Sequence, residues 1–149
     1  MFKKVCIIGC GLIGSSLARA IKKNGLSSKI VSSNRSDSVN KKVIELKIVD
    51  DSNSDTKKMA DGSDLIIIAT PLSSYESVIL KIKDSLKNGT ILTDVGSVKE
   101  NVISLVEKAV PENVSWISSH PIAGTEESGP DAGFSELFQN RWCILTPSK

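Results

Sequence analysis

The chain has 149 residues, of which 40% are hydrophobic and 24% charged, and its formal net charge is +2. This length suffices for one full hydrophobic core, so we expect a single domain over residues 1–149. The small net charge and an aromatic content of 4% argue against a nucleic-acid partner. No apolar run approaches the ~20 residues that a transmembrane helix needs, so we expect no membrane partner.

The N-terminus resembles a secretory signal, because two lysines precede an apolar stretch. That stretch, residues 5–8, is too short for a secretory core and reads better as a strand. The cysteines Cys6, Cys10 and Cys143 are odd in number and lack CxxC spacing, which indicates reduced thiols rather than a disulfide framework. We therefore expect a cytoplasmic protein, and we expect no metal site.

Strand and helix patterns alternate along the rest of the chain. Strands are expected over residues 4–8, 29–33, 48–50, 65–69, 90–93, 115–118 and 142–145. Helices are expected where apolar side chains recur at helical spacing, over residues 13–23, 39–46, 75–86 and 102–110. Residues 50–56 and 124–133 read as polar turns or loops. The alternation predicts an α/β fold with a doubly wound, mostly parallel sheet and helices on both faces.

A glycine motif joins the first strand to the first helix. In the sequence Gly9-x-Gly11-x-x-Gly14, the first glycine allows a tight turn, the second lets the backbone approach a pyrophosphate, and the third allows close helix–strand packing. The free N–H groups at the helix start then face the phosphates. This context predicts a Rossmann-type nucleotide site formed by Gly9, Gly11, Leu12, Ile13 and Gly14. The alternative is a glycine-rich turn without a ligand.

The end of the second strand should contact the ribose of a bound dinucleotide. Asn34, Arg35 and Ser36 stand there, with no carboxylate among them to repel a 2′-phosphate and a guanidinium to pair with it. The sequence therefore favours NADP over NAD as cofactor. In the alternative, Arg35 is a solvated loop charge and Asn34 bonds the 2′-hydroxyl of NAD; nearby Asp37 keeps this possibility open.

Further polar residues follow the later strands, whose carboxyl ends should meet at one edge of the sheet. Thr70 and Pro71 are expected at the cofactor. His120 is the only histidine in the chain, and histidine is the side chain that most often serves as a general acid or base. Ser97 could hold a substrate hydroxyl or orient the imidazole.

Each of these residues also has a structural interpretation. Ser97 and Glu100 have the spacing of a capping box at the start of a helix. Lys99 reads as a solvent-facing charge, and Asp94 as a turn residue at a strand end. Glu126 and its neighbour could simply keep the loop soluble.

Three segments resemble the prephenate and arogenate dehydrogenases of tyrosine biosynthesis, in family order. They are Gly9-Cys10-Gly11-Leu12-Ile13-Gly14-Ser15-Ser16, Asp94-Val95-Gly96-Ser97-Val98-Lys99 and His120-Pro121-Ile122-Ala123-Gly124-Thr125-Glu126-Glu127-Ser128-Gly129. The last is the most specific, because it is not a general feature of nucleotide-binding folds.

The resemblance implies NAD(P)-dependent oxidative decarboxylation of a small molecule, prephenate or arogenate, to 4-hydroxyphenylpyruvate or tyrosine. His120 would bond the 4-hydroxyl of the substrate, Ser97 would contact that hydroxyl and the cofactor, and Glu126, beside Thr125, would control access to the site. The family's C-terminal helical domain, which forms a homodimer and supplies an arginine for the substrate carboxylate, is absent from these 149 residues. We expect this chain to be the cofactor-binding domain.

Two other functions stay open from the sequence. One is another two-domain dehydrogenase, of the 3-hydroxyacid or pyrroline-carboxylate reductase type, which shares the glycine motif but not the His120–Gly124 segment. The other is a non-catalytic module that senses NAD(P). The sequence does not decide between prephenate and arogenate.

Overall fold

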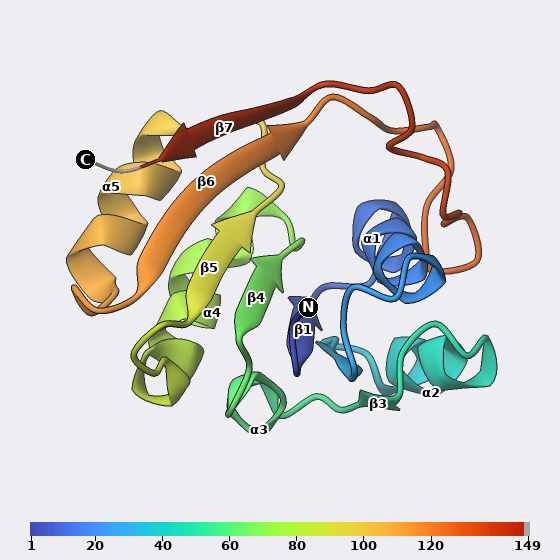
Figure 1. Cartoon of the computed structure of the whole chain (residues 1–149), viewed down its shortest axis with the longest axis horizontal. Helices are drawn as coiled ribbons and strands as arrows, with labels where there is room; N and C mark the ends of the chain where they lie inside the picture. Colours follow the sequence, from blue (N-terminus) through green and yellow to red (C-terminus); the bar gives the residue numbers. More distant parts are fainter. Residues whose placement is uncertain (148–149) are drawn as a thin grey trace.

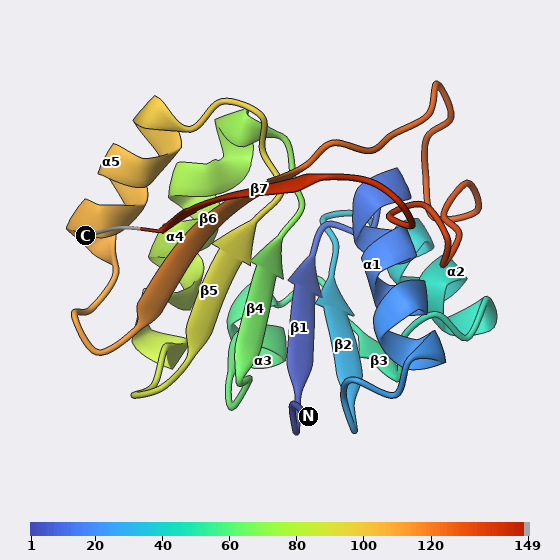
Figure 2. The same ribbon diagram turned by 45° about the horizontal axis from the view of Figure 1, so that its top comes forward.

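The computed structural model describes residues 1–147 and shows a seven-stranded sheet in the order β3-β2-β1-β4-β5-β6-β7 (Figure 1). The strands are β1 (Val5–Ile8), β2 (Ile30–Ser33), β3 (Asp51–Ser52), β4 (Leu65–Ile68), β5 (Ile91–Asp94), β6 (Ser115–Pro121) and β7 (Cys143–Pro147). Neighbours from β3 to β6 are parallel, whereas β7 runs antiparallel to β6. Figure 2 shows strands β1, β2, β4 and β5 side by side, and Figure 1 shows β7 running beside β6. The predicted doubly wound, mostly parallel sheet is confirmed.

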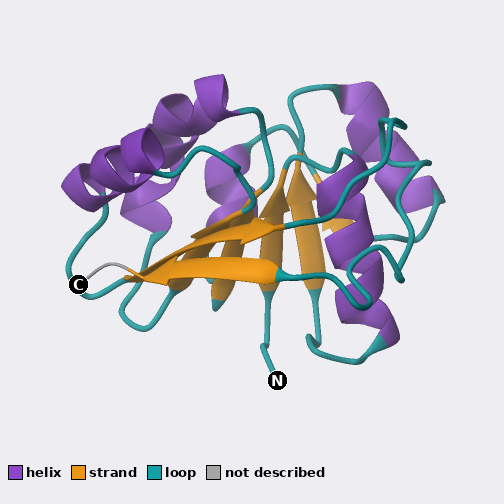
Figure 3. Cartoon of the chain, turned by 90° about the horizontal axis from the view of Figure 1, so that it is seen from above, coloured by secondary structure: helices purple, strands orange, loops and turns teal. Residues whose placement is uncertain are grey.

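Helices flank the sheet in two groups (Figure 3). They are α1 (Leu12–Lys23), α2 (Asp37–Glu45), α3 (Thr56–Ala60), α4 (Tyr75–Ile82) and α5 (Glu100–Ala109), with 3₁₀ turns at Leu72–Ser74 and Lys83–Ser85. Successive strand side chains point to opposite faces, so Val5 and Ile7 pack with α1 and α2. Cys6 and Ile8 pack with α3, α4 and α5. Both faces therefore carry a buried apolar layer.

The expected strands and helices differ from the observed ones by one to four residues at one or both ends, and the strand expected over 115–118 extends to Pro121 and so includes His120. The strand expected at 48–50 lies at 51–52, because Ile48 N still donates to Val43 O at the end of α2 and pairing with β2 begins at Asp51. The polar segment expected to be a turn leads into α3, whose start is capped by Asp55 accepting a hydrogen bond from Lys58 N at 3.0 Å. The helix expected over 75–86 becomes a 3₁₀ turn after Ile82.

The chain between β6 and β7 runs from the sheet edge to α1 and back (Figure 1). Phe134 N donates to Ser16 Oγ at 3.1 Å, and Lys23 forms an ion pair with Glu136. This segment therefore packs against one side of α1, from Ser16 to the last residue of the helix. Within residues 1–147 no helix is long and apolar enough to cross a bilayer.

Candidate functional site

A cleft of about 530 Å³ opens at the carboxyl ends of β1, β2 and β4. The strand order reverses there, since β2 and β4 lie on opposite sides of β1, and ligands of doubly wound folds bind at such a point. Its lining includes seven of the residues predicted to bind the cofactor, namely Gly9, Gly11, Asn34, Arg35, Ser36, Thr70 and Pro71. Leu12, Ile13 and Gly14 form the first turn of α1 and do not line the cleft.

The glycine turn is as tight as its motif predicts. Gly9 has φ +95°, and a Cβ there would lie 2.8 Å from the carbonyl oxygen of Ala69. A Cβ at Gly14 would lie 2.1 Å from Gly9 O, whereas one at Gly11 would have no atom within 4 Å. The start of α1 carries no side-chain cap and no acidic residue in its first turn. Its positive dipole end is thus suited to an anion.

Asn34 is engaged inside the protein. It is buried, its Oδ1 accepts from Cys10 N at 2.6 Å, and its Nδ2 donates to Asn40 Oδ1 at 3.0 Å. The side chain therefore ties the glycine turn to the end of β2. Arg35 and Ser36, by contrast, are exposed at the cleft.

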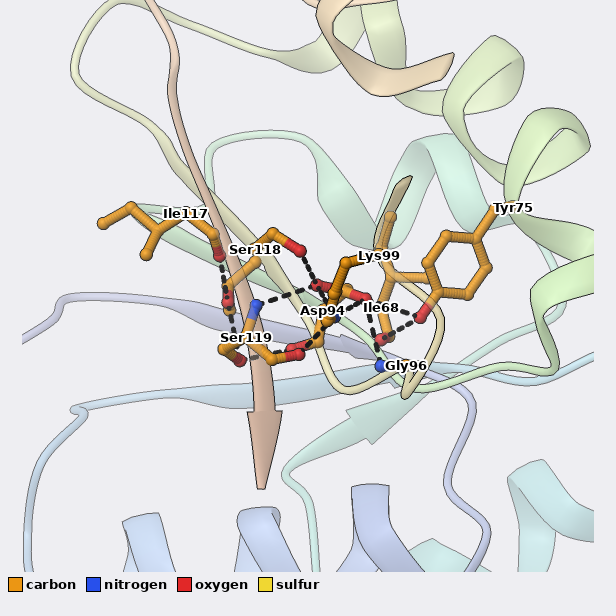
Figure 4. Close-up of polar contacts among 9 residues, drawn as sticks. Ile68, Tyr75, Asp94, Gly96, Lys99, Ile117, Ser118 and Ser119 are labelled. Carbon is orange, nitrogen blue, oxygen red and sulfur yellow. Dashed lines mark hydrogen bonds and ion pairs between the residues drawn. The ribbon is translucent and has the colours of Figure 1, made fainter. Parts of the chain in front are cut away.

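A second polar cluster lies at the ends of β5 and β6, around Asp94 (Figure 4). Its carboxylate is fully buried and forms a 2.7 Å ion pair with Lys99, whose side chain is 17% exposed. Tyr75, Gly96 and Ser118 also donate to it. The interpretations of Asp94 as a turn residue and Lys99 as a solvent-facing charge are therefore wrong. Burial, reinforced by the Asp94 charge, raises the pKa of Tyr75 above its usual range.

Of the two predicted catalytic residues, Ser97 follows β5 and His120 lies on β6. His120 is half-buried and pairs with Ile144 of β7. Ser97 is exposed in the loop that follows β5. The predicted capping box is wrong, because α5 begins at Glu100 after Lys99 and no side chain caps its start.

The loop after β6 places Thr125 and Glu126 at the surface, where Thr125 Oγ1 accepts from Glu127 N at 3.2 Å. Farther along, Gly129 and Pro130 line the cleft, which the sequence did not predict. Among the described residues, no cluster of three His, Cys, Asp or Glu side chains is arranged to hold a metal ion.

One sequence signal could have revealed the contact between this loop and α1. Ser15 and Ser16 are fully buried small polar residues directly after the glycine motif. A Cβ at Gly133 would lie 2.1 Å from Ser15 Oγ, so the loop backbone packs directly onto these serines. Small polar side chains on an inward helix face indicate such a close backbone approach.

Comparison with known proteins identifies relatives of this arrangement. A family model described as "Prephenate dehydrogenase, nucleotide-binding domain" matches residues 17–149. The cyclohexadienyl dehydrogenase of Zymomonas mobilis is 38% identical over 99% of this chain and 50% of its own length.

Two solved structures have the same fold over nearly the whole chain. The prephenate dehydrogenase of Aquifex aeolicus, in complex with hydroxyphenyl propionate and NAD+, superposes with a TM-score of 0.93 at 28% identity, over 100% of this chain and 52% of that one. Synechocystis arogenate dehydrogenase gives 0.89 at 29% identity, over 98% and 50%. The chain thus spans about half the length of these relatives.

Proposed function

We propose that this chain, which belongs to the family of prephenate dehydrogenase nucleotide-binding domains, is the NAD(P)-binding part of an enzyme that oxidatively decarboxylates prephenate or arogenate. The observation that carries the proposal is the cleft at the point where the strand order reverses. The glycine turn and the loops after β2 and β4 line this cleft together. The free thiols fit a reducing cytoplasm. Homodimer formation through the part of the relatives that this chain does not span belongs to the same proposal.

The cleft fits a dinucleotide. The open space at Gly11 and the uncapped start of α1 suit a pyrophosphate, since backbone N–H groups and the helix dipole both favour phosphate charge. When bound, the nicotinamide cofactor supplies the acceptor for the hydride that leaves the substrate ring. Thr70 and Pro71, at the end of β4, lie on the opposite side of the cleft from Arg35.

NADP is the proposed form of the cofactor. Asn34 is held by internal hydrogen bonds, which leaves the exposed Arg35 and Ser36 to meet a 2′-phosphate at the start of α2. Arg35→Ala should weaken NADP+ binding about 10-fold, the size of a lost charge-assisted contact, and leave NAD+ binding unchanged. Equal affinity of the wild type for both cofactors would count against NADP, with exposed Asp37 as the residue to test next.

His120 is proposed as the group that accepts the proton of the substrate 4-hydroxyl as the ring carbon is oxidised. Ser97 would hold the same hydroxyl, and Glu126, with Thr125, would control access from the exposed loop. The ring becomes aromatic when CO₂ leaves, so these residues mainly orient the substrate and hold one proton.

The test measures absorbance at 340 nm with the full-length natural protein, NADP+ or NAD+, and prephenate or arogenate. His120→Asn should lower kcat by about 10²- to 10⁴-fold, the usual contribution of a general base. Cofactor affinity should not change. Cofactor binding without turnover of either substrate by the wild type would refute the dehydrogenase and favour a nucleotide-sensing module.

A further inference from the structure

The strand that carries His120 extends beyond its parallel neighbour. Pairing between β5 and β6 ends at Thr93 and Ile117, whereas β6 continues to Pro121. On the opposite side, β7 pairs with β6 along this whole extension, including His120 with Ile144. The end of β6 therefore has a strand on one side only, at the position of the proposed catalytic histidine.

Two side chains replace the missing strand on the other side. Ser119 N donates to Asp94 Oδ1 at 3.0 Å, and Ser119 O accepts from Lys99 Nζ. In a parallel ladder, the N–H and C=O of one residue bond to the same neighbouring strand. Here the Asp94 carboxylate accepts from the N–H of Ser119, and the Lys99 ammonium donates to its C=O. Ser119 Oγ also donates to the backbone oxygen of Asp94 (Figure 4).

The ion pair is itself held firmly. Lys99 Nζ lies 2.8 and 2.7 Å from the two carboxylate oxygens of Asp94. Tyr75 OH and Gly96 N donate to Oδ2 at 3.1 and 3.0 Å, and Ser118 Oγ donates to Oδ1 at 3.1 Å. Every partner comes from α4, the loop after β5, or β6, so the buried carboxylate links three elements.

The same carboxylate also fixes the start of the loop that contains Ser97. Gly96 N is bonded to it, and a Cβ at Gly96 would lie 3.1 Å from Asp94 Oδ2 and 3.0 Å from Tyr75 OH. The backbone immediately before Ser97 is therefore packed against the ion pair. One buried pair thus contacts the residues that precede both proposed catalytic side chains.

We infer that Asp94 and Lys99 are a positioning pair that sets the backbone of His120 and Ser97 for catalysis. The inference rests on the proposed function for its catalytic consequence, but the placement of His120 is measurable without turnover. Lys99 acts through the carbonyl group of Ser119, whose carbon is bonded to the backbone nitrogen of His120. Loss of the Lys99 side chain therefore frees the peptide group that joins Ser119 to His120. A displacement of a catalytic group by about 1 Å can lower the rate about 100-fold.

The experiment compares Lys99→Met with Lys87→Met in the full-length protein. Lys87 is a matched control, because it pairs with Asp61 at 3.0 Å on the surface, where both side chains are 62% exposed. The ¹H–¹⁵N signals of the His120 imidazole, assigned by their loss in His120→Asn, report its surroundings, and His120 is the only histidine among these 149 residues. The second readout is kcat, and the third is the Kd for NADP+.

Lys99→Met should shift the His120 imidazole signals and lower kcat about 100-fold, with the NADP+ Kd within about twofold of wild type. Lys99→Arg, which restores a charge and donors, should move both readouts back toward wild type. If Lys99→Met does not fold, Lys99→Gln is measured in the same way, because Asp94 keeps its other donors.

Unchanged His120 signals in a folded Lys99 variant would overturn the inference, as would equal effects from Lys87→Met. Absence of turnover in the wild type refutes the proposed function instead, and the imidazole signals still test the positioning pair.

Discussion

Replacing Gly14 with alanine should destabilise the protein, because α1 has no room for a methyl group against the glycine turn. The new Cβ would lie 2.1 Å from Gly9 O and 3.2 Å from Ile7 Cγ2, and both neighbours belong to β1 or its turn. Restoring ordinary contact requires α1 to move by about 1 Å, and overpacking of this kind costs about 3 kcal/mol. The better helix propensity of alanine offsets about 1 kcal/mol. The free energy of unfolding should therefore fall by about 2 kcal/mol.

Circular dichroism during heating measures this change, which corresponds to a fall in Tm of about 6 °C for a chain of this size. Gly11→Ala is the matched control, since its Cβ would have no atom within 4 Å. Its Tm should equal that of wild type, while NADP+ binding weakens because the methyl group stands where a pyrophosphate approaches α1. An unchanged Tm for Gly14→Ala, or the same loss of Tm in both variants, would refute the reasoning.

Three further predictions concern thiols, pH and surface charge. Burial raises the pKa of Cys6 to about 12 and that of Cys10 to about 11. At pH 8 the folded 149-residue chain should therefore give one fast thiol with Ellman's reagent, exposed Cys143, and three thiols after denaturation. Two fast thiols before denaturation would contradict the buried positions. Above pH 9 the buried thiols of the folded state keep their protons, whereas unfolded thiols with a pKa of 9.0 lose theirs. Tm should therefore fall as the pH rises from about 9 toward 12, and a constant Tm over this range would refute the prediction. Lys87→Ala, at the exposed pair with Asp61, should change the free energy of unfolding in urea by less than about 1 kcal/mol.

Features that depend on local chain geometry were predictable from the residues alone. The apolar run at 65–69 and the alternation of strand and helix patterns predicted β4 and the doubly wound sheet. Gly9 and Gly14 predicted the tight turn, because its backbone geometry excludes a Cβ at both positions. The seven predicted cleft residues followed from this topology, since parallel strands direct their carboxyl ends to one edge.

Features that depend on partners far apart in the sequence were not predictable in this way. Asn34 lines the cleft as predicted for a cofactor contact, but its hydrogen bonds to Cys10 and Asn40 were not foreseen. α3 was missed because its residues carry no helical apolar stripe and its packing comes from β1, β2 and α4.

The sequence by itself determined the longer strands and helices and the tight glycine turn, because helix and strand periodicity and glycine conformation are properties of neighbouring residues. Only the tertiary structure decided that Asp94 is a buried hydrogen-bond centre and Lys99 its ion-pair partner. The reason is that a carboxylate at a strand end is solvated or buried according to which other strand ends lie beside it. Here β6 extends past β5, and its Ser118 hydroxyl and Ser119 N–H, 24 and 25 residues away along the chain, supply donors that keep the charge inside.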